Sequence, residues 1–219
     1  MRKFLGEAVL GLMLAGSVSA GPISFSSAGG QSTEGIGAFS GTIQYHNNQL
    51  TLTLTNQNTP QQGGYITAFA FMVPDAVTGV SLASYSYGFD TLLGPGVSAP
   101  PLGTFDFGLS TNGSWTGGGP PQQGVPVGGT GTFVFNISGL LAPMTTQQFY
   151  DLIANPSNPT GQMPDSWLAV RFRGGLDPNG WSDKVTPGWP LTDVPEPSTY
   201  LMLGSAFAGL ALLRLRRRA

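Results

Sequence analysis

The sequence predicts an all-β protein, an antiparallel β-sandwich with one short helix, and three observations indicate this fold class. Short apolar runs alternate with polar residues at a period of two, which is typical of strands with one buried face. The 33 glycines and 18 prolines among 219 residues separate these runs and favour turns. Helical spacing of apolar residues occurs in only one segment of the body. These features predict two packed sheets, and a jelly roll is one strand topology that fits them.

The clearest element is a β-hairpin over residues 39–56, in which two alternating segments flank Asn47-Asn48. A two-residue loop at Asn47-Asn48 sets the register of the two strands. The pairs expected on the apolar face are Tyr45 with Leu50, Ile43 with Leu52, and Gly41 with Leu54. The opposite face is polar throughout.

Further strands are expected in order along the chain. Residues 65–73 are apolar on both faces and end at Pro74, which predicts a central strand covered on both sides. Residues 81–89 are a weaker, aromatic strand candidate. Alternation defines three more apolar faces, made of these sets: Phe105, Phe107 and Leu109; Phe133, Phe135 and Ile137; Leu168, Val170 and Phe172.

The remaining body segments are one loop and one helix. Residues 113–131 are rich in Gly and Pro and are interpreted as a long surface loop. The helix is expected over residues 144–154, with Thr145 as its N-cap and Asn155-Pro156 as its stop. Its apolar face is expected to contain Phe149, Leu152 and Ile153.

Residues 1–20 have the organisation of a secretory signal peptide. Arg2-Lys3 precede an apolar run over residues 8–14, and Val18-Ser19-Ala20 is a small-x-small cleavage site. Signal peptidase is therefore expected to cut between Ala20 and Gly21. The body of the protein would then lie outside the cytoplasm.

Residues 191–219 form a second distinctive terminus with three parts. Val194, Pro195, Glu196 and Pro197 form an extended segment, since proline resists helix interiors and extends the residue before it. Residues 198–213 are expected to be a short transmembrane helix. The apolar part, residues 200–213, would be about 21 Å long, short of the roughly 30 Å hydrocarbon core, so it spans only with help from snorkelling arginines. These arginines, in the basic tail 214–219, bias that end to the cytoplasm; they are Arg214, Arg216, Arg217 and Arg218.

In this order, at the extreme C-terminus, these parts resemble the PEP-CTERM sorting signal of exported bacterial proteins, over about 26 of the 219 residues. The resemblance implies recognition by an exosortase, a membrane-embedded cysteine protease, with Pro195, Glu196 and Pro197 as the recognised element. It implies cleavage near Pro197 and transfer of the body from the inner membrane to the cell surface or an extracellular matrix. A plain single-span anchor is the alternative interpretation.

The composition of the body, residues 21–190 as one domain, limits its function. Residues 21–194 carry three basic and nine acidic side chains, a net charge near −6. This balance argues against nucleic-acid binding, which depends on Lys and Arg. With 0 Cys, the chain has no disulfide framework, thiol nucleophile or thiolate metal site.

Few residues suggest chemistry. His46 is the only histidine, and the hairpin register places it on a polar face beside the turn, where it is interpreted as an exposed turn residue. A pair of carboxylates for glycoside hydrolysis would draw on acids such as Asp90 and Asp106. Asp106 falls on the solvent side of its alternation, and these acids are interpreted as solvated surface groups.

Two weak binding candidates remain. Asp177, Asn179 and Asp183 surround a glycine turn and offer oxygen ligands of the kind calcium prefers, although a simple Asx-turn explains them and no tight binding is expected. Trp115, Trp181 and Trp189 fall in loop segments, where rings could stack on sugars or fold over the core.

The preferred hypothesis is therefore an exported, non-enzymatic structural or adhesive β-domain, delivered to the cell surface or an exopolysaccharide matrix. A carbohydrate-binding module at the same location is the alternative, and a secreted hydrolase is the least favoured. No cofactor is expected.

Overall fold

The computed structural model describes residues 21–116, 119–140, 143–154, 166–176 and 180–188. The chain separates into two compact units, and the described residues all belong to the unit Ala20–Pro195, which contains the body. The predicted signal peptide, the sorting motif, the short transmembrane helix and the basic tail lie outside the described residues.

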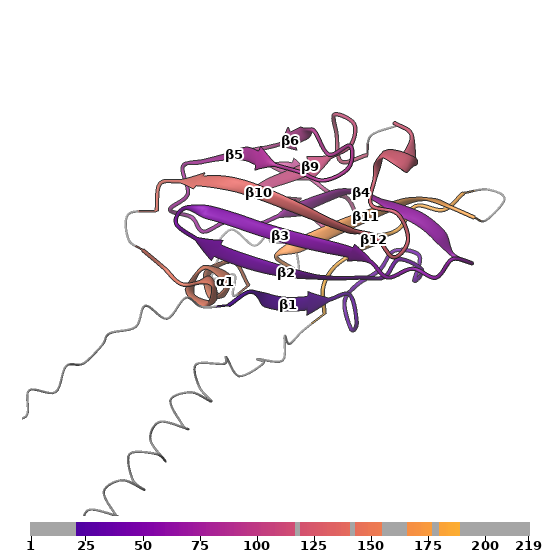
Figure 1. Ribbon diagram of the computed structural model, residues 1–219, viewed down its shortest axis with the longest axis horizontal. Coiled ribbons are helices and arrows are strands. Elements are labelled where there is room, and N and C mark those ends of the chain that lie inside the picture. The colour runs from indigo at the N-terminus through magenta and orange to yellow at the C-terminus, as the bar shows by residue number, and fades with distance from the viewer. Residues whose placement is uncertain (1–20, 117–118, 141–142, 155–165, 177–179, 189–219) are drawn as a thin grey trace, which may run out of the picture. The chain divides into compact units, whose positions relative to one another are not determined.

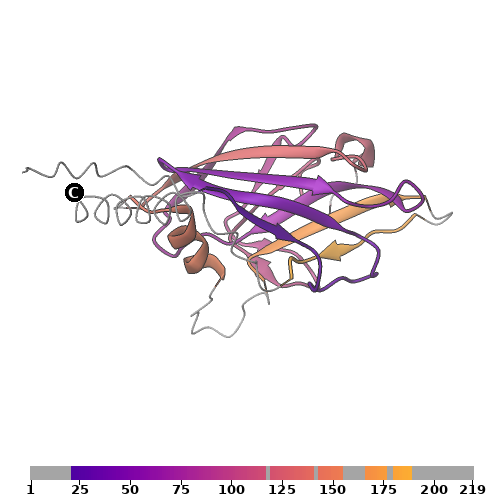
Figure 2. The same ribbon diagram turned by 60° about the horizontal axis from the view of Figure 1, so that its bottom comes forward.

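Two five-stranded antiparallel sheets form the body and pack face to face, which confirms the predicted β-sandwich (Figures 1 and 2). The first sheet has the order β1 (Ile23–Ser26), β2 (Phe39–His46), β3 (Gln49–Asn56), β10 (Thr130–Ser138) and β5 (Gly79–Ser84). The second has the order β12 (Lys184–Val185), β11 (Leu168–Gly175), β4 (Gly63–Phe71), β9 (Phe107–Ser110) and β6 (Thr91–Leu93). A separate two-stranded sheet consists of β7 (Val97–Ser98) and β8 (Thr104–Phe105).

The order of pairing bears on the jelly-roll interpretation. The ladders β6–β9, β5–β10 and β4–β11 nest one inside the next along the chain, a winding typical of jelly rolls. The next pair outward is missing, because β3 pairs with β10 and β12 pairs with β11. Within the described residues, the jelly-roll winding is thus confined to the part of the chain from β4 to β11.

The hairpin of β2 and β3 has the register expected from sequence, with Tyr45 opposite Leu50, Ile43 opposite Leu52 and Gly41 opposite Leu54. Asn47 and Asn48 have φ angles of 49° and 60°. Positive φ at both loop positions defines a type I′ turn, whose twist matches that of the flanking strands, and asparagine tolerates this conformation better than most residues.

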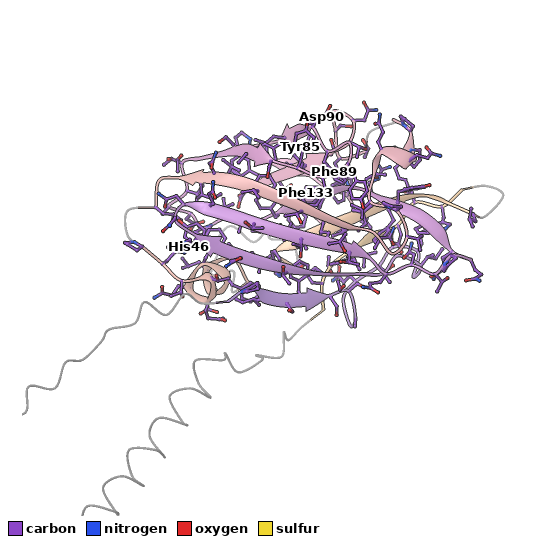
Figure 3. All side chains as sticks on the ribbon, in the orientation of Figure 1. His46, Tyr85, Phe89, Asp90 and Phe133 are labelled. Carbon is purple, nitrogen blue, oxygen red and sulfur yellow. The ribbon has the colours of Figure 1, made fainter. Side chains whose placement is uncertain are left out.

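The core lies between the sheets and is rich in phenylalanine. The inward-facing residues of β10, Phe133, Phe135 and Ile137, are buried as their alternation predicted. Ring centroids of Phe133 lie 4.7 Å from Phe69 and 4.8 Å from Phe89. Phe133 and Phe89 are labelled in Figure 3. Each such ring pair adds about 0.5–1.5 kcal/mol beyond simple burial, so this cluster ties together β4, β10 and the segment after β5.

β4 is central and covered on both faces, as predicted. One face supplies Phe69 and Phe71 to the main core, while Ala68 and Ala70 contact a second, smaller cluster. That cluster comes from the β7–β8 region and the loop after β9, and contains Val97, Ala99, Leu102, Phe105 and Trp115, together with Ala169 of β11. The small alanine side chains leave room for these larger residues on the outer face of the second sheet.

Two strand predictions are wrong in part. Phe105 does not share a face with Leu109, because Phe105 packs in the smaller cluster and Leu109 in the main core. The chain leaves the β7–β8 pair at Asp106 before it joins the second sheet as β9, and this change of partner breaks the alternation. Strand β5 also ends at Ser84, so residues 85–89 are irregular although Phe89 is fully buried.

The segment 113–131 is more structured than the predicted surface loop. It contains the short 3₁₀-helix η1 (Pro121–Gln123). Val125 is fully buried in the main core. Its N–H donates to the carbonyl oxygen of Ile66 at 2.9 Å and its carbonyl accepts the Ile66 N–H at 3.0 Å. An isolated bridge thus satisfies the buried backbone without a strand, which alternation cannot predict.

The single α-helix within the described residues, α1 (Thr146–Ala154), lies next to β2 at one end of the sandwich (Figure 1). The Thr145 hydroxyl accepts the Gln148 N–H at 3.2 Å, and the Gln148 side chain accepts the Thr145 N–H at 2.9 Å. This capping box confirms the predicted N-cap. Leu152 is 56% exposed, however, and Tyr150 is buried instead, because the helix meets β2 through the stripe of Thr146, Phe149, Tyr150 and Ile153.

Candidate functional sites

His46 is an exposed residue at the β2–β3 turn, as predicted. Figure 3 shows it far from Asp90, which is also exposed. The Asp90 carboxylate accepts a hydrogen bond from the Thr91 hydroxyl at 2.9 Å. Across the described residues, no three or more His, Asp or Glu side chains gather where they could hold a metal ion.

Asp183 has a different role from the cation ligand considered above. The side chain is fully buried, and its carboxylate accepts hydrogen bonds from the loop between β1 and β2. The donors are the Ser32 hydroxyl at 2.7 Å, the Thr33 hydroxyl and N–H at 2.9 Å each, and the N–H groups of Glu34 at 3.0 Å, Ile36 at 3.0 Å and Gly37 at 2.8 Å. Both oxygens are occupied by protein donors, so they are not available to a cation. Asp177 and Asn179 lie outside the described residues.

The same hydrogen bonds control the charge of Asp183. Burial by itself would raise the pKa of this carboxyl, but the donors from Gly37, Ser32, Ile36 and Glu34 outweigh it and hold the pKa below its usual range. The carboxylate is therefore ionised at neutral pH and fixes residues 32–37 to the strand that begins at Lys184.

The two described candidate tryptophans pack inside the body. Trp115 is 3% exposed within the smaller cluster, and its carbonyl oxygen accepts a hydrogen bond from Nη1 of buried Arg171 at 2.9 Å. Trp181 is partly buried against Phe172, and its indole N–H donates to the Gln62 carbonyl at 3.1 Å. Trp115 thus covers the core, and its ring is too deeply buried to stack on a sugar, so the sugar-contact hypothesis is wrong for this residue. Trp189 lies outside the described residues.

A cleft that sequence reasoning missed lies where β4 ends. It has a volume of about 550 Å³ and is bounded by the segment after β4, the start of β5, the end of β6 and the junction of β8 with β9. Its apolar wall includes Val77, Val80, Leu92, Pro95 and Phe107. Of the lining residues that the structure describes, Asp75 and Asp106 are the charged ones.

Asp106 is half-buried and does not lie on the open solvent side that alternation predicted. Its Oδ2 accepts the Val73 N–H at 2.8 Å, and its main-chain carbonyl accepts the Gly96 N–H at 2.9 Å. Burial raises the pKa of the Asp106 carboxyl, the Val73 hydrogen bond opposes this rise, and the negative charge of Asp75 adds to it. Asp90 does not line the cleft. The acid that shares the cleft with Asp106 and acts on its charge is Asp75.

Local sequence held no signal for this cleft except the turn-forming Pro74-Asp75 pair. Three segments that are separate in the chain form it, residues 73–80, 92–95 and 106–107, and β5 belongs to one sheet while β6 and β9 belong to the other. Asp75 follows β4 and Asp106 precedes β9, and the antiparallel pairing of these two strands brings both acids to the same opening.

The comparisons with known proteins concern the C-terminus. Residues 193–218 match the family model of the PEP-CTERM protein-sorting motif. This match places the chain among exported proteins that are sorted through their C-terminus. More particularly, the chain carries the signal handled by an exosortase-type system.

The match covers 26 residues, so it identifies the sorting signal and leaves the body unassigned. No curated protein and no solved structure matches the chain. In the part of the chain that the structure describes, no helix is long and apolar enough to cross a membrane.

Proposed function

We propose that this chain is a structural or adhesive protein of the cell surface or of an exopolysaccharide matrix, and that it is not an enzyme. The sorting motif at residues 193–218 carries this proposal, because it indicates export and sorting through an exosortase-type system. The β-sandwich is then the delivered part.

The proposed route has three steps. Signal peptidase cuts between Ala20 and Gly21 during export. The helix of residues 198–213 then holds the chain in the inner membrane, with Arg214, Arg216, Arg217 and Arg218 on the cytoplasmic side. An exosortase finally recognises Pro195, Glu196 and Pro197, cuts near Pro197, and releases the body to the surface or the matrix.

The proposal of a non-enzymatic body is supported by what the described residues place together. The single histidine is exposed at a turn and lies far from Asp90. The described residues that line the hollow beside it include no Ser, Asp or Glu, whereas a catalytic base needs a nucleophile and an orienting group. The hydroxyl and carboxylate groups around Asp183 are bound to one another and hold a loop in place.

A carbohydrate-binding function at the same location is the second candidate. The outer face of the first sheet is polar and uncharged along β3 and β10, where Thr51, Thr53, Thr55, Thr130 and Thr132 alternate with buried residues. Several of these groups bond across strands, as the hydroxyls of Thr55 and Thr130 do at 2.7 Å. Such a face offers neutral hydrogen-bonding groups to a neutral polysaccharide. Retention of the protein on a polysaccharide column would favour this candidate.

The sorting part is tested by Glu196→Ala in the producing cells. We expect the variant to keep its arginine tail and to stay in the membrane fraction, while the wild-type chain is cut at both ends; intact-mass analysis of cell and medium fractions reports both cuts. Glu34→Ala removes an exposed acid of the same type from the body and serves as the matched control. Normal processing and release of Glu196→Ala would contradict the assigned recognition element.

A further inference from the structure

The cleft at the end of β4 combines two carboxylates with an apolar wall. Val80 comes from the first sheet, while Leu92 and Phe107 come from the second. All three are partly buried and pack against the main core, so the wall of the cleft is a rigid continuation of the sandwich. A volume of about 550 Å³ lies within the range of small-molecule sites, roughly 300–1,000 Å³.

Asp106 is held in a fixed orientation at this cleft. The Val73 N–H donates to Oδ2 of Asp106, and the Gly96 N–H donates to the main-chain carbonyl oxygen of Asp106. These contacts come from two segments that bound the opening, and they hold Asp106 where it lines the cleft. Asp75 lies after the Pro74 turn, exposed at the same opening.

The two carboxylates repel each other, since the charge of Asp75 disfavours ionisation of Asp106. Among the described residues that line the cleft, none is Lys, Arg or His. A neutral ligand would leave this repulsion in place, whereas a cation between the carboxylates would remove it and gain a charge-assisted hydrogen bond from each. The apolar wall would receive the uncharged part of the same ligand.

We propose that this cleft binds a small organic cation, a primary ammonium group carried on a short alkyl chain or on a sugar ring. The ammonium lies between Asp75 and Asp106, and the carbon skeleton lies against Leu92, Pro95 and Phe107. This site does not depend on how the chain is sorted.

The test uses the purified full-length chain and three probes. Glucosamine carries an ammonium on a sugar, N-acetylglucosamine is its neutral counterpart, and 1,4-diaminobutane carries ammonium groups on an alkyl chain. Binding is measured by calorimetry and by chemical-shift changes of amides at the cleft. Asp75→Asn and Asp106→Asn remove one charge each but keep an oxygen acceptor, so Asp106→Asn can still hold the Val73 N–H. Asp90→Asn, an exposed acid outside the cleft, is the matched control.

We expect at least one amine to bind at millimolar concentration or below and N-acetylglucosamine to bind about tenfold more weakly or not at all. Each cleft variant should weaken amine binding by about tenfold or more, the loss of one charge-assisted hydrogen bond, while Asp90→Asn leaves it unchanged. Preference for glucosamine or for 1,4-diaminobutane identifies the source of the ammonium. Equal binding of the neutral sugar, or amine binding unaffected by both cleft variants, would overturn the proposal.

Discussion

Replacement of Asp183 should produce the largest loss of stability of any single carboxylate in the body. The side chain is fully buried and accepts six hydrogen bonds from residues 32–37. Asp183→Ala would leave four backbone N–H groups of that loop without their acceptor. A buried group left unsatisfied costs about 1–3 kcal/mol, but the loop can relax toward water, so contributions do not add fully.

We therefore expect Asp183→Ala to lower the free energy of unfolding by about 4 kcal/mol, similar to breaking a buried ion pair. Asp183→Asn keeps the shape and one acceptor oxygen, and its cost should be about half as large. Urea unfolding followed by tryptophan fluorescence measures both, with Asp90→Asn as the exposed control. A loss below about 1 kcal/mol for Asp183→Ala would refute the structural role, since surface substitutions typically fall within about 0.5 kcal/mol.

The pH dependence of the same variants gives an independent readout. The folded pKa of Asp183 lies below that of the unfolded chain, about 3.9, so the folded state binds fewer protons in this range. The stabilisation is thus complete above the unfolded pKa and is lost as the pH falls through the folded pKa. Wild-type protein should lose stability on acidification below about pH 4, and Asp183→Asn should lose less over the same interval.

Two further predictions concern packing. Gly175→Ala should destabilise the body by about 2 kcal/mol or more, because a Cβ there would overlap the Trp181 indole and displace it from Gln62. The control is Gly79→Ala, whose Cβ would meet its nearest neighbour at 3.9 Å. Equal melting temperatures for the two variants would contradict this packing. Ile153→Ala should cost about 2–4 kcal/mol, whereas Leu152→Ala should change the free energy of unfolding by less than about 0.5 kcal/mol, since Leu152 is 56% exposed and Ile153 is 4% exposed. Equally large losses in urea unfolding would mean that both residues are buried, as the face expected from sequence required.

Several elements could be predicted from the sequence because their causes are local. The β2–β3 hairpin follows from strict alternation and from two asparagines that tolerate positive φ. The cap of α1 follows from a threonine and a glutamine three residues apart. The PEP-CTERM motif is likewise a local pattern at residues 193–218. In each case neighbouring residues contain the whole signal.

Other features have their cause in distant parts of the chain. The helix spacing alone did not distinguish Leu152 from Tyr150, because the angle at which α1 meets β2 selects the buried stripe. The alternation around Phe105 failed because the chain changes its strand partner at Asp106. Val125 is buried by a bridge to Ile66 that no periodic pattern marks.

The sequence by itself thus determined the all-β class, the hairpin register and the sorting signal, since periodicity, turn residues and a linear motif act over a few neighbouring positions. Tertiary structure alone decided that Asp183 binds the Thr33 backbone 150 positions earlier, that Trp115 is buried, and that Asp75 and Asp106 share one cleft. These outcomes depend on which segments meet when distant strands pair and the two sheets pack, and a carboxylate has the same local pattern whether it meets six donors, one donor or water.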